Sequence, residues 1–316
     1  MRIVDLKTPT KDYEYPGDCG LCLGFFDGVH LGHQALIRKL QEENKKREHA
    51  LPLGALCFTS SPKDYFSPTT PTPLLTPLPQ KLEKLRQAGL RFAVLYDFPE
   101  IRDLDAFDFV KDILIKTLRC RLLVCGYNFT FGKDAKGTPK ELAQYFGSQP
   151  NRSFFEVPAV KKDGQAVSAS LIRMMLNVGH PEAAARLLGT AYAVTGKVRD
   201  GRHVGRTLGV PTANMYFENG YLVPRHGVYI TTIKVDGRTY SGISNVGIRP
   251  TFDCEDGVNC ESFLFDFSGT LYQKNITVSF LRFIRQEKKF ETSAALREQI
   301  QMDINSAKKY FDGHWY

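Results

Sequence analysis

The sequence predicts an α/β domain with a parallel sheet and helices on both faces, followed by a small antiparallel β-barrel with a closing helix. Three observations lead to this fold class. The chain has 316 residues, which at roughly 100–200 residues per domain favours two domains. Apolar strands alternate with helical segments through residues 1–188. Short β-rich runs separated by turns occupy residues 189–285, and a closing helix follows them. We therefore place the domain boundary between residues 188 and 189.

In the first part, buried-strand patterns and amphipathic helices follow one another. The predicted strands cover residues 21–26, 53–59, 92–97, 121–125 and 154–157. The predicted helices cover residues 33–48, 80–88 and 107–118, with helical turns from 171 to 188. Because residues 67–79 are rich in proline and threonine, we expect a surface loop there. Strand–helix alternation indicates a parallel sheet, whose ligands sit at the carboxyl ends of the strands.

In the second part, β-branched and aromatic runs are separated by turn signals such as Asp236-Gly237 and Ser268-Gly269. The predicted strands cover residues 191–198, 227–235, 239–244, 261–267 and 276–283. This spacing is typical of a small antiparallel barrel or sandwich. A closing helix is predicted from one apolar stripe at helical spacing. The stripe consists of Leu296, Ile300, Ile304, Ala307 and Phe311.

The charge balance favours small anionic partners. Lys and Arg number 42 against 34 Asp and Glu, a formal net charge of +8. The basic residues are scattered: the densest run, Lys45-Lys46-Arg47, is mixed with glutamates, as on a solvated helix face. Because nucleic-acid binding needs basic residues clustered on one face, we expect no nucleic-acid partner. The modest excess of positive charge is better explained by the binding of phosphate groups in a cleft.

No run approaches the roughly 18 apolar residues that a membrane span needs, and the N-terminal residues lack the apolar segment of a signal peptide. We therefore expect no membrane partner and a cytoplasmic location. The seven cysteines fit reduced thiols. Cys19 and Cys22 form a Cys-x-x-Cys pair, but Cys254 and Cys260 lack the spacing of a second zinc-binding pair; a redox role is the minor alternative.

A glycine-rich turn joins the first predicted strand to the first helix, in the stretch LGFFDGVHLGH at residues 23–33. Gly28 permits an unusual backbone angle, and Gly32 permits close approach of another group. His30 and His33, three residues apart, project from one face of the first helical turn. A helix N-terminus attracts anions. Because no third metal ligand stands at a recognisable spacing, the pattern favours phosphate binding over a metal site.

A second glycine-rich and basic segment spans residues 196–214. Its Gly-rich part can wrap phosphates with backbone N–H groups. Thr212 and Asn214 offer two neutral oxygens on one side of an extended chain, and hard oxygens suit Mg²⁺. The alternative is a glycine-rich loop that closes a barrel. The candidate phosphate-binding residues are Gly196, Lys197, Val198, Gly201, Gly205, Gly209, Thr212 and Asn214.

The stretch Gly24-Phe25-Phe26-Asp27-Gly28-Val29-His30-Leu31-Gly32-His33 resembles the first motif of the His-x-Gly-His nucleotidyltransferases, and more closely that of the prokaryotic bifunctional riboflavin kinase/FAD synthetase family. Residues 167–173 resemble that family's Ser-Ser-Thr-x-x-Arg element, with Ala169 and Ser170 in place of the second Ser and the Thr. The resemblance implies a nucleotidyltransferase-like, Rossmann-type sheet with His30, His33 and Arg173 as catalytic residues. It implies ATP binding by Gly24, Phe26, Asp27, Gly28, His30, Gly32, His33, Ser168, Ser170 and Arg173.

Residues 124–132 resemble the family's second motif, at the end of a predicted strand. Asn128 stands where the family often has Asp, and Thr130 where it often has Arg. The resemblance implies that Asn128, Phe129 and Phe131 bind the flavin. For the two phenylalanines, packing in a core is an equally weighted alternative.

The second part resembles the riboflavin kinase half of the same family. The similarity lies in the glycine-rich segment with Pro211-Thr212-Ala213-Asn214 and in residues 245–252, 261–267 and 285–290. It implies a riboflavin kinase-like barrel in which Glu261 is the general base for the riboflavin 5′-hydroxyl. Thr212 and Asn214 would hold Mg²⁺.

The resemblance implies an FMN adenylyltransferase domain at residues 1–188 and a riboflavin kinase domain at 189–316. Riboflavin, FMN, FAD and ATP are then the partners, and Mg²⁺ and ATP the cofactor and co-substrate. Two alternatives stay open at this point. One is a monofunctional kinase or synthetase whose other half has decayed. The other is a non-catalytic flavin-binding regulator, against which Thr212, Asn214 and Glu261 argue, because a binder needs no base.

Overall fold

The computed structural model describes residues 2–6, 17–61, 64–65, 67, 69, 71–199, 212–218, 220–248 and 257–313. The chain divides into two compact units, Met1–Ala169 and Ser170–Tyr316. This division lies before residue 188 because helices α7 (Ala169–Val178) and α8 (Pro181–Leu188) pack with the second unit; for example, the Arg225 N–H donates to the Leu176 carbonyl at 3.0 Å. The functional boundary at 188/189 stays a prediction.

The first unit is built on a six-stranded sheet in the order β1-β4-β3-β2-β5-β6. Its strands are β1 (Arg2–Asp5), β2 (Cys19–Leu23), β3 (Leu53–Phe58), β4 (Phe92–Tyr96), β5 (Cys120–Gly126) and β6 (Ser153–Val157). Strands β2 to β6 are parallel, and β1 is an antiparallel edge. Because β2 pairs with both β3 and β5, the strand order reverses at β2, the position at which open α/β sheets bind their ligands.

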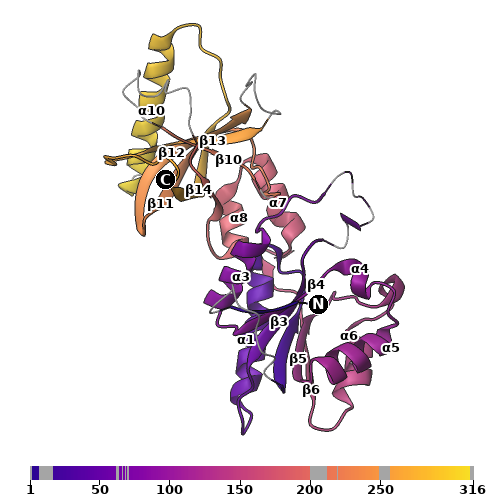
Figure 1. The fold of residues 1–316 in the computed structure, drawn as a ribbon. Helices are drawn as coiled ribbons and strands as arrows, with labels where there is room; N and C mark the ends of the chain where they lie inside the picture. Colours follow the sequence, from indigo (N-terminus) through magenta and orange to yellow (C-terminus); the bar gives the residue numbers. More distant parts are fainter. Residues whose placement is uncertain are drawn as a thin grey trace. The chain divides into compact units, whose positions relative to one another are not determined.

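Helices cover both faces of this sheet, as strand–helix alternation predicts (Figure 1). One face carries α1 (Leu31–Lys45) and α3 (Leu78–Gln87); the other carries the continuous helix α5–η2, wound as a π-helix over Phe109–Thr117. The shorter elements are η1 (Asp27–Val29), α4 (Phe98–Ile101), α5 (Ala106–Asp108), η3 (Lys133–Ala135), α6 (Pro139–Leu142), η4 (Ala143–Gly147), and the hairpin β7 (Lys161–Lys162) and β8 (Gln165–Ala166).

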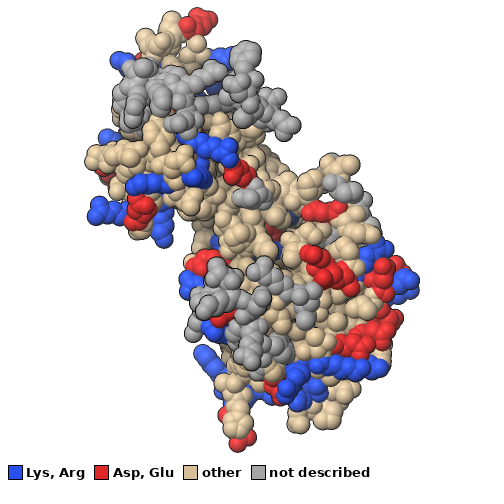
Figure 2. Space-filling view, viewed as in Figure 1, with Lys and Arg blue, Asp and Glu red and all other residues tan. Residues whose placement is uncertain are grey.

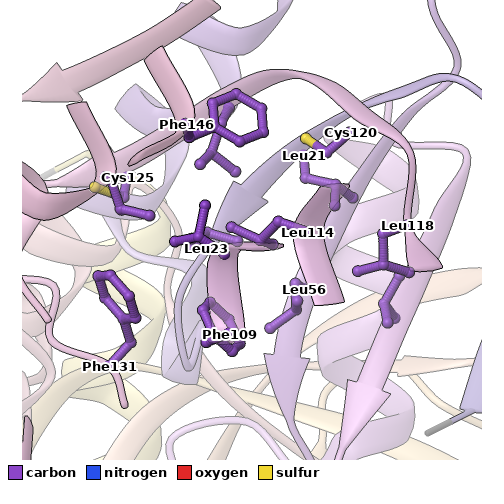
Figure 3. Packing of buried hydrophobic residues seen from close by; sticks show 14 of the residues in the cluster. Leu21, Leu23, Leu56, Phe109, Leu114, Leu118, Cys120, Cys125, Phe131 and Phe146 are labelled. Carbon is purple, nitrogen blue, oxygen red and sulfur yellow. The ribbon is translucent and has the colours of Figure 1, made fainter. Parts of the chain in front are cut away.

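The strands supply side chains to a core on each face of the sheet. In β2, Leu21 and Leu23 face the core under η2, and Cys22 faces the core under α1. Figure 3 shows the first of these cores, with Leu23, Leu114 and Phe146 among its members. Burial on both sides explains why β2 is a continuous apolar run rather than an alternating one.

The second unit is a six-stranded antiparallel sheet in the order β10-β13-β12-β11-β14-β9. An isolated bridge between Arg199 and Asn214 connects its two edges, since Arg199 follows β9 and Asn214 lies in β10. The sheet thus curls into the barrel-like form that the sequence predicts. Its strands are β9 (Tyr192–Lys197), β10 (Ala213–Tyr216), β11 (Gly227–Val235), β12 (Arg238–Ile248), β13 (Val258–Leu264) and β14 (Asn275–Arg285).

The closing helix α10 (Ser293–Phe311) covers this sheet. Ile300, Ile304, Ala307 and Phe311 of the predicted stripe pack with Ile230 of β11 and with neighbouring apolar residues. Thr292 caps the helix, because its side chain accepts a hydrogen bond from the Ala295 N–H. The helical periodicity therefore predicted both the element and its buried face.

Several sequence expectations need correction. The predicted strand at 21–26 ends at Leu23, because Phe26 takes a left-handed conformation (φ 57°) and turns the chain out of the sheet. The expected surface loop at 67–79 is buried at its end, since Leu75 and Thr76 are 2% and 3% exposed, and its last two residues belong to α3. Strands β1 and β10 were not predicted.

The charged residues of the surface are interspersed. On the face drawn in Figure 2, lysines and arginines lie beside aspartates and glutamates. Ion pairs account for part of this pattern: Glu43 pairs with both Lys39 and Lys46 at 2.7 Å, and Glu83 pairs with Arg86 at 2.7 Å. Among the described residues, no helix is long and apolar enough to cross a membrane.

Candidate active sites

The first candidate site begins with a strained turn at the carboxyl end of β2. Phe26, Gly28 and Val29 all have left-handed backbone angles, with φ of 57°, 78° and 46°. Only glycine adopts this region without a penalty, so Phe26 and the β-branched Val29 cost about 1–3 kcal/mol each. Strain of this kind concentrates at functional sites, where the surrounding structure holds it in place.

The Asp27 carboxylate holds this turn against the end of the 67–79 segment. Asp27 is 1% exposed. Its Oδ2 accepts a hydrogen bond from the Leu75 N–H (3.1 Å), and its Oδ1 accepts one from the Thr76 N–H (2.9 Å). This explains why a stretch rich in Pro and Thr is buried at its end: its backbone donors satisfy a buried carboxylate.

His30 and His33 lie side by side at the N-terminus of α1, as their three-residue spacing predicts. Their rings stack with centroids 3.7 Å apart at an interplanar angle of 16°. His30 caps the helix, because its Nδ1 accepts a hydrogen bond from the His33 N–H at 3.4 Å. Burial lowers the pKa of His33 well below 6.5, and the neighbouring His30 and Lys81 lower it further. His33 is therefore neutral at physiological pH.

Gly32 leaves little room for a side chain. A Cβ on Gly32 would stand 3.0 Å from the His30 ring and 3.7 Å from the Val167 carbonyl oxygen. The predicted residue Ser168 directly follows that carbonyl, and therefore lies in the neighbourhood of the histidine turn. Ser168 is half-buried. Ser170 and Arg173, exposed and half-buried respectively, lie on α7 and belong to the second unit.

The predicted flavin residues follow β5, the parallel neighbour of β2. Both strands end at the same edge of the sheet, so residues 126–131 share that edge with the histidine turn. Asn128 is exposed, and its side chain lies close to Gly126 at the end of β5: its Oδ1 would be 3.5 Å from a Cβ added to that glycine. Phe129 is half-buried, with its ring 5.9 Å from the ring of Phe131.

Phe131 itself belongs to the core. It is 7% exposed, its ring lies 5.2 Å from that of Phe109, and its backbone exchanges hydrogen bonds with Gly137. Figure 3 shows the two labelled rings on the same side of the core. Of the two alternatives for this residue, core packing is the one that the structure shows.

The second candidate site lies where β10 and β13 pair. Asn214 stands directly opposite Glu261, so the two side chains share one face of the sheet. The Thr212 Oγ1 donates a 2.5 Å hydrogen bond to Glu261 Oε1. Asn214 is 5% exposed, and its Oδ1 accepts a hydrogen bond from Asn259 Nδ2 at 3.3 Å. The structure thus brings together the three residues that the sequence predicted.

The donor set of this second site fits Mg²⁺. Thr212 and Asn214 offer a hydroxyl and an amide oxygen, the hard ligands that Mg²⁺ prefers. Among the described residues, no group of three or more His, Cys, Asp or Glu could hold a metal ion. Mg²⁺ is commonly held by few protein oxygens and keeps several water and phosphate ligands, so a pair of neutral oxygens is compatible with it.

The other predicted kinase residues take different places. Gly196 packs closely on β10, because a Cβ there would stand 2.7 Å from the side chain of Met215. Lys197 is exposed, and Val198 is 1% exposed, with its N–H bonded to the Lys274 carbonyl. The remaining predicted positions, Gly201, Gly205 and Gly209, lie outside the described residues.

Sequence reasoning missed two neighbours of the sites. Asn245 stands opposite Glu261 on β12, and its Nδ2 donates to Glu287 Oε1 at 3.0 Å. Lys81, on α3, is 1% exposed and acts electrostatically on His33. A signal for Lys81 was present: the residue shares the buried face of its helix with Leu85, a place where a lysine is unusual.

Both parts of the chain are similar to known proteins. A family model described as FAD synthetase matches residues 12–171, and one described as riboflavin kinase matches residues 188–311. The bifunctional riboflavin kinase/FMN adenylyltransferase of Bacillus subtilis is 34% identical over 295 residues, covering 92% of each chain. The chain belongs to the bifunctional riboflavin kinase/FMN adenylyltransferase family.

A second curated relative supports this assignment, and a solved structure shares the fold of the chain. The riboflavin kinase/FMN adenylyltransferase of Escherichia coli K12 is 32% identical over 297 residues, covering 93% of each chain. A solved structure titled as a macrolide-efflux protein from Streptococcus pneumoniae matches with a TM-score of 0.84 and 29% identity, covering 96% of this chain and 97% of that one. As a riboflavin kinase/FMN adenylyltransferase, the chain carries both catalytic domains and uses ATP as co-substrate.

Proposed function

We propose that the two candidate sites carry the two reactions of the family separately. Riboflavin is phosphorylated to FMN beside Thr212, Asn214 and Glu261. FMN is then adenylylated to FAD, with release of pyrophosphate, at the turn that holds His30 and His33. The observation that carries this proposal is the 2.5 Å hydrogen bond between Thr212 and Glu261, with Asn214 opposite the same glutamate.

In the kinase step, Glu261 is the general base. Its carboxylate accepts the proton of the riboflavin 5′-hydroxyl as that oxygen attacks the γ-phosphorus of ATP, and ADP leaves. Thr212 donates to Oε1 and so orients the carboxylate. Phosphoryl transfer depends mainly on positioning and charge neutralisation, so one oriented base suffices.

Thr212 and Asn214 are the residues that would hold Mg²⁺. When bound, the ion supplies neutralisation of the negative charge on the ATP phosphates. Because the Thr212 hydroxyl gives its proton to Glu261, its oxygen lone pairs face away from that bond and suit a cation. Asn259 Nδ2 donates to Asn214 Oδ1 and so restrains the orientation of the Asn214 amide.

In the adenylyltransferase step, the N-terminus of α1 and the two imidazoles bind the phosphates of ATP. Backbone N–H groups at a helix N-terminus favour anions. His33, held neutral, contributes hydrogen bonds rather than charge as negative charge develops in the transition state. An FMN phosphate oxygen attacks the α-phosphorus, and the bond to pyrophosphate breaks. Asp27 stabilises this turn, because its carboxylate accepts hydrogen bonds from the Leu75 and Thr76 N–H groups.

Asn128 and Phe129 are the residues we assign to FMN, because both are accessible at the sheet edge shared with the histidine turn. Phe131 supports Phe129 from the core. Ser168, which directly follows the Val167 carbonyl close to Gly32, supplies a hydroxyl donor to the ATP phosphates. Ser170 and Arg173 lie on α7 in the second unit, and their predicted role toward the ATP phosphates rests on the sequence motif alone.

We propose the cytoplasm as the place of action. The six cysteines that the structure describes are buried thiols, which suits a reducing compartment. Burial raises the pKa of Cys57 to about 11 and that of Cys125 to about 12, so these thiols stay protonated and unreactive.

Product analysis tests the proposed pair of reactions. The purified chain is incubated with ATP and Mg²⁺, in one tube with riboflavin and in another with FMN, and the flavins are separated by chromatography. We expect FMN and FAD from riboflavin, and FAD from FMN. FMN as the only product in the first tube, with no FAD in either, would refute the adenylyltransferase assignment.

A further inference from the structure

Lys81 is a buried cation beside the histidine turn. It lies on α3 and is 1% exposed. Its Nζ stands 4.1 Å from the centroid of the Phe25 ring and 3.5 Å from the Phe58 carbonyl oxygen. Phe25 belongs to the glycine-rich turn itself, and Phe58 ends β3, the strand beside β2. Lys81 thus connects the turn to the neighbouring strand.

The charge of Lys81 is poorly compensated. Among the described residues, no carboxylate lies within 4.0 Å of its Nζ, and its one hydrogen bond is long. Burial lowers the pKa of Lys81, and Cys57 and Asp27 oppose this shift. Cys57 is a buried thiol, and the two oxygens of the Asp27 carboxylate accept hydrogen bonds from the Leu75 and Thr76 N–H groups. A methionine would fill the same space without the desolvation penalty. A purely structural role therefore gives little reason for a lysine here.

The position of Lys81 beside Phe25 of the turn indicates where its charge acts. His30 stacks on the His33 ring from the helix cap, and Phe26 contacts that ring from the turn. The charge of Lys81 acts on the same ring electrostatically. Asp27, beneath the turn, acts on Lys81. A positive charge at this place attracts an anion at the N-terminus of α1 and disfavours a second positive charge on His33.

We propose that Lys81 is a positioning residue of adenylyl transfer, whose buried ammonium, held between Phe25 and the Phe58 carbonyl, supplies a fixed positive charge behind His33. The ATP phosphates bind in front of that imidazole, and Lys81 acts on them through the turn rather than by contact. This inference rests on the proposed role of His33 in binding those phosphates.

The test compares charge-removing and charge-keeping variants of the full chain. Lys81→Met removes the charge at similar length, Lys81→Gln is a second neutral variant, and Lys81→Arg keeps the charge. Lys84→Met, one turn along α3, is the matched control because Lys84 is also partly buried. FAD formation from FMN and ATP is measured between pH 5.5 and 8.5, and FMN formation from riboflavin reports on the second unit. Histidine NMR follows the titration of the His33 ring, assigned with His33→Gln.

We expect both neutral variants to lose at least about tenfold in kcat/KM for ATP in FAD formation. The acid limb of their pH profile and the NMR titration of His33 should both move to higher pH. Lys81→Arg should keep both at the wild-type position, and Lys84→Met should change nothing.

Wild-type kinetics in the folded neutral variants would overturn the proposal. So would a loss of rate with an unchanged pH profile and an unchanged His33 titration, because that result is the mark of a structural role. If His33→Gln itself keeps full FAD synthesis, the proposed role of the histidine fails instead. The two failures are therefore distinguishable.

Discussion

Thr212 and Glu261 are joined by a 2.5 Å hydrogen bond from Oγ1 to Oε1, although 49 residues separate them in the chain. The pairing of β10 with β13 creates this contact, because it places Asn214 directly opposite Glu261 and Thr212 just before the strand. The proposed base and the two proposed ligands of a cation therefore depend on one strand register. A slip of β10 by one residue would turn Thr212 and Asn214 to the face of the sheet opposite Glu261.

Glu261→Gln should abolish the kinase activity alone. The amide keeps the size of the side chain and an oxygen for the Thr212 hydroxyl, but it cannot take up the proton of the riboflavin 5′-hydroxyl. We expect FMN formation to fall by at least about 100-fold, measured by chromatography with riboflavin and ATP. FAD formation from supplied FMN should be unchanged. Loss of both activities in a folded variant would show that the sites are not independent.

Thr212→Val removes the hydroxyl group of Thr212, and Thr212→Ser removes only its methyl group, so the two variants test the two groups one at a time. Valine keeps the shape but leaves Glu261 without the 2.5 Å hydrogen bond and removes one proposed Mg²⁺ ligand. We expect FMN formation to fall by about tenfold or more and its Mg²⁺ requirement to rise. Serine keeps the hydroxyl and should retain most of the activity. The measurement is a Mg²⁺ titration of the kinase rate, and equal rates in both variants would argue against the assignment.

The sequence predicted those parts of the fold that depend on local patterns. Buried strands such as β2 and β5 appear as apolar runs, and α10 appears as a stripe at helical spacing. Strand β1 was missed because four residues carry little periodicity, and only pairing with β4 makes them a strand. The π-helical winding of η2 likewise has no sequence signal.

In the second candidate site, the predicted Thr212 and Asn214 meet the predicted Glu261 through the pairing of β10 with β13. In the first candidate site, predicted residues come together where one segment contains them. His30 and His33 stack because they lie three residues apart on one helix. The partners from distant segments were not foreseen: the Leu75 and Thr76 N–H groups bind Asp27 across more than 40 residues, and Lys81 comes from another helix. Such contacts arise from tertiary packing, which a local pattern does not encode.

Gly32→Ala should impair FAD formation without unfolding the chain. The added Cβ would stand 3.0 Å from the His30 ring, so the ring must move by a few tenths of an ångström. Since catalysis is sensitive to small displacements, we expect about a tenfold loss in FAD formation. Gly147→Ala is the control, because its Cβ would meet Phe154 at an ordinary 3.5 Å. Equal rates for the two variants would show that the His30 ring position is not critical.

The stability of the first unit should fall as the pH drops below about 6.5, in part because of His33. Burial holds its folded-state pKa well below 6.5, so in acid the unfolded chain binds a proton that the folded chain does not. This difference lowers the free energy of unfolding by up to about 1.4 kcal/mol per pH unit. Denaturant unfolding between pH 5 and 8 measures the slope, which His33→Gln should reduce. His49→Gln, at an exposed position in the same unit, should keep the wild-type slope. An unchanged slope in His33→Gln would mean that His33 takes up its proton equally in the folded and unfolded chains.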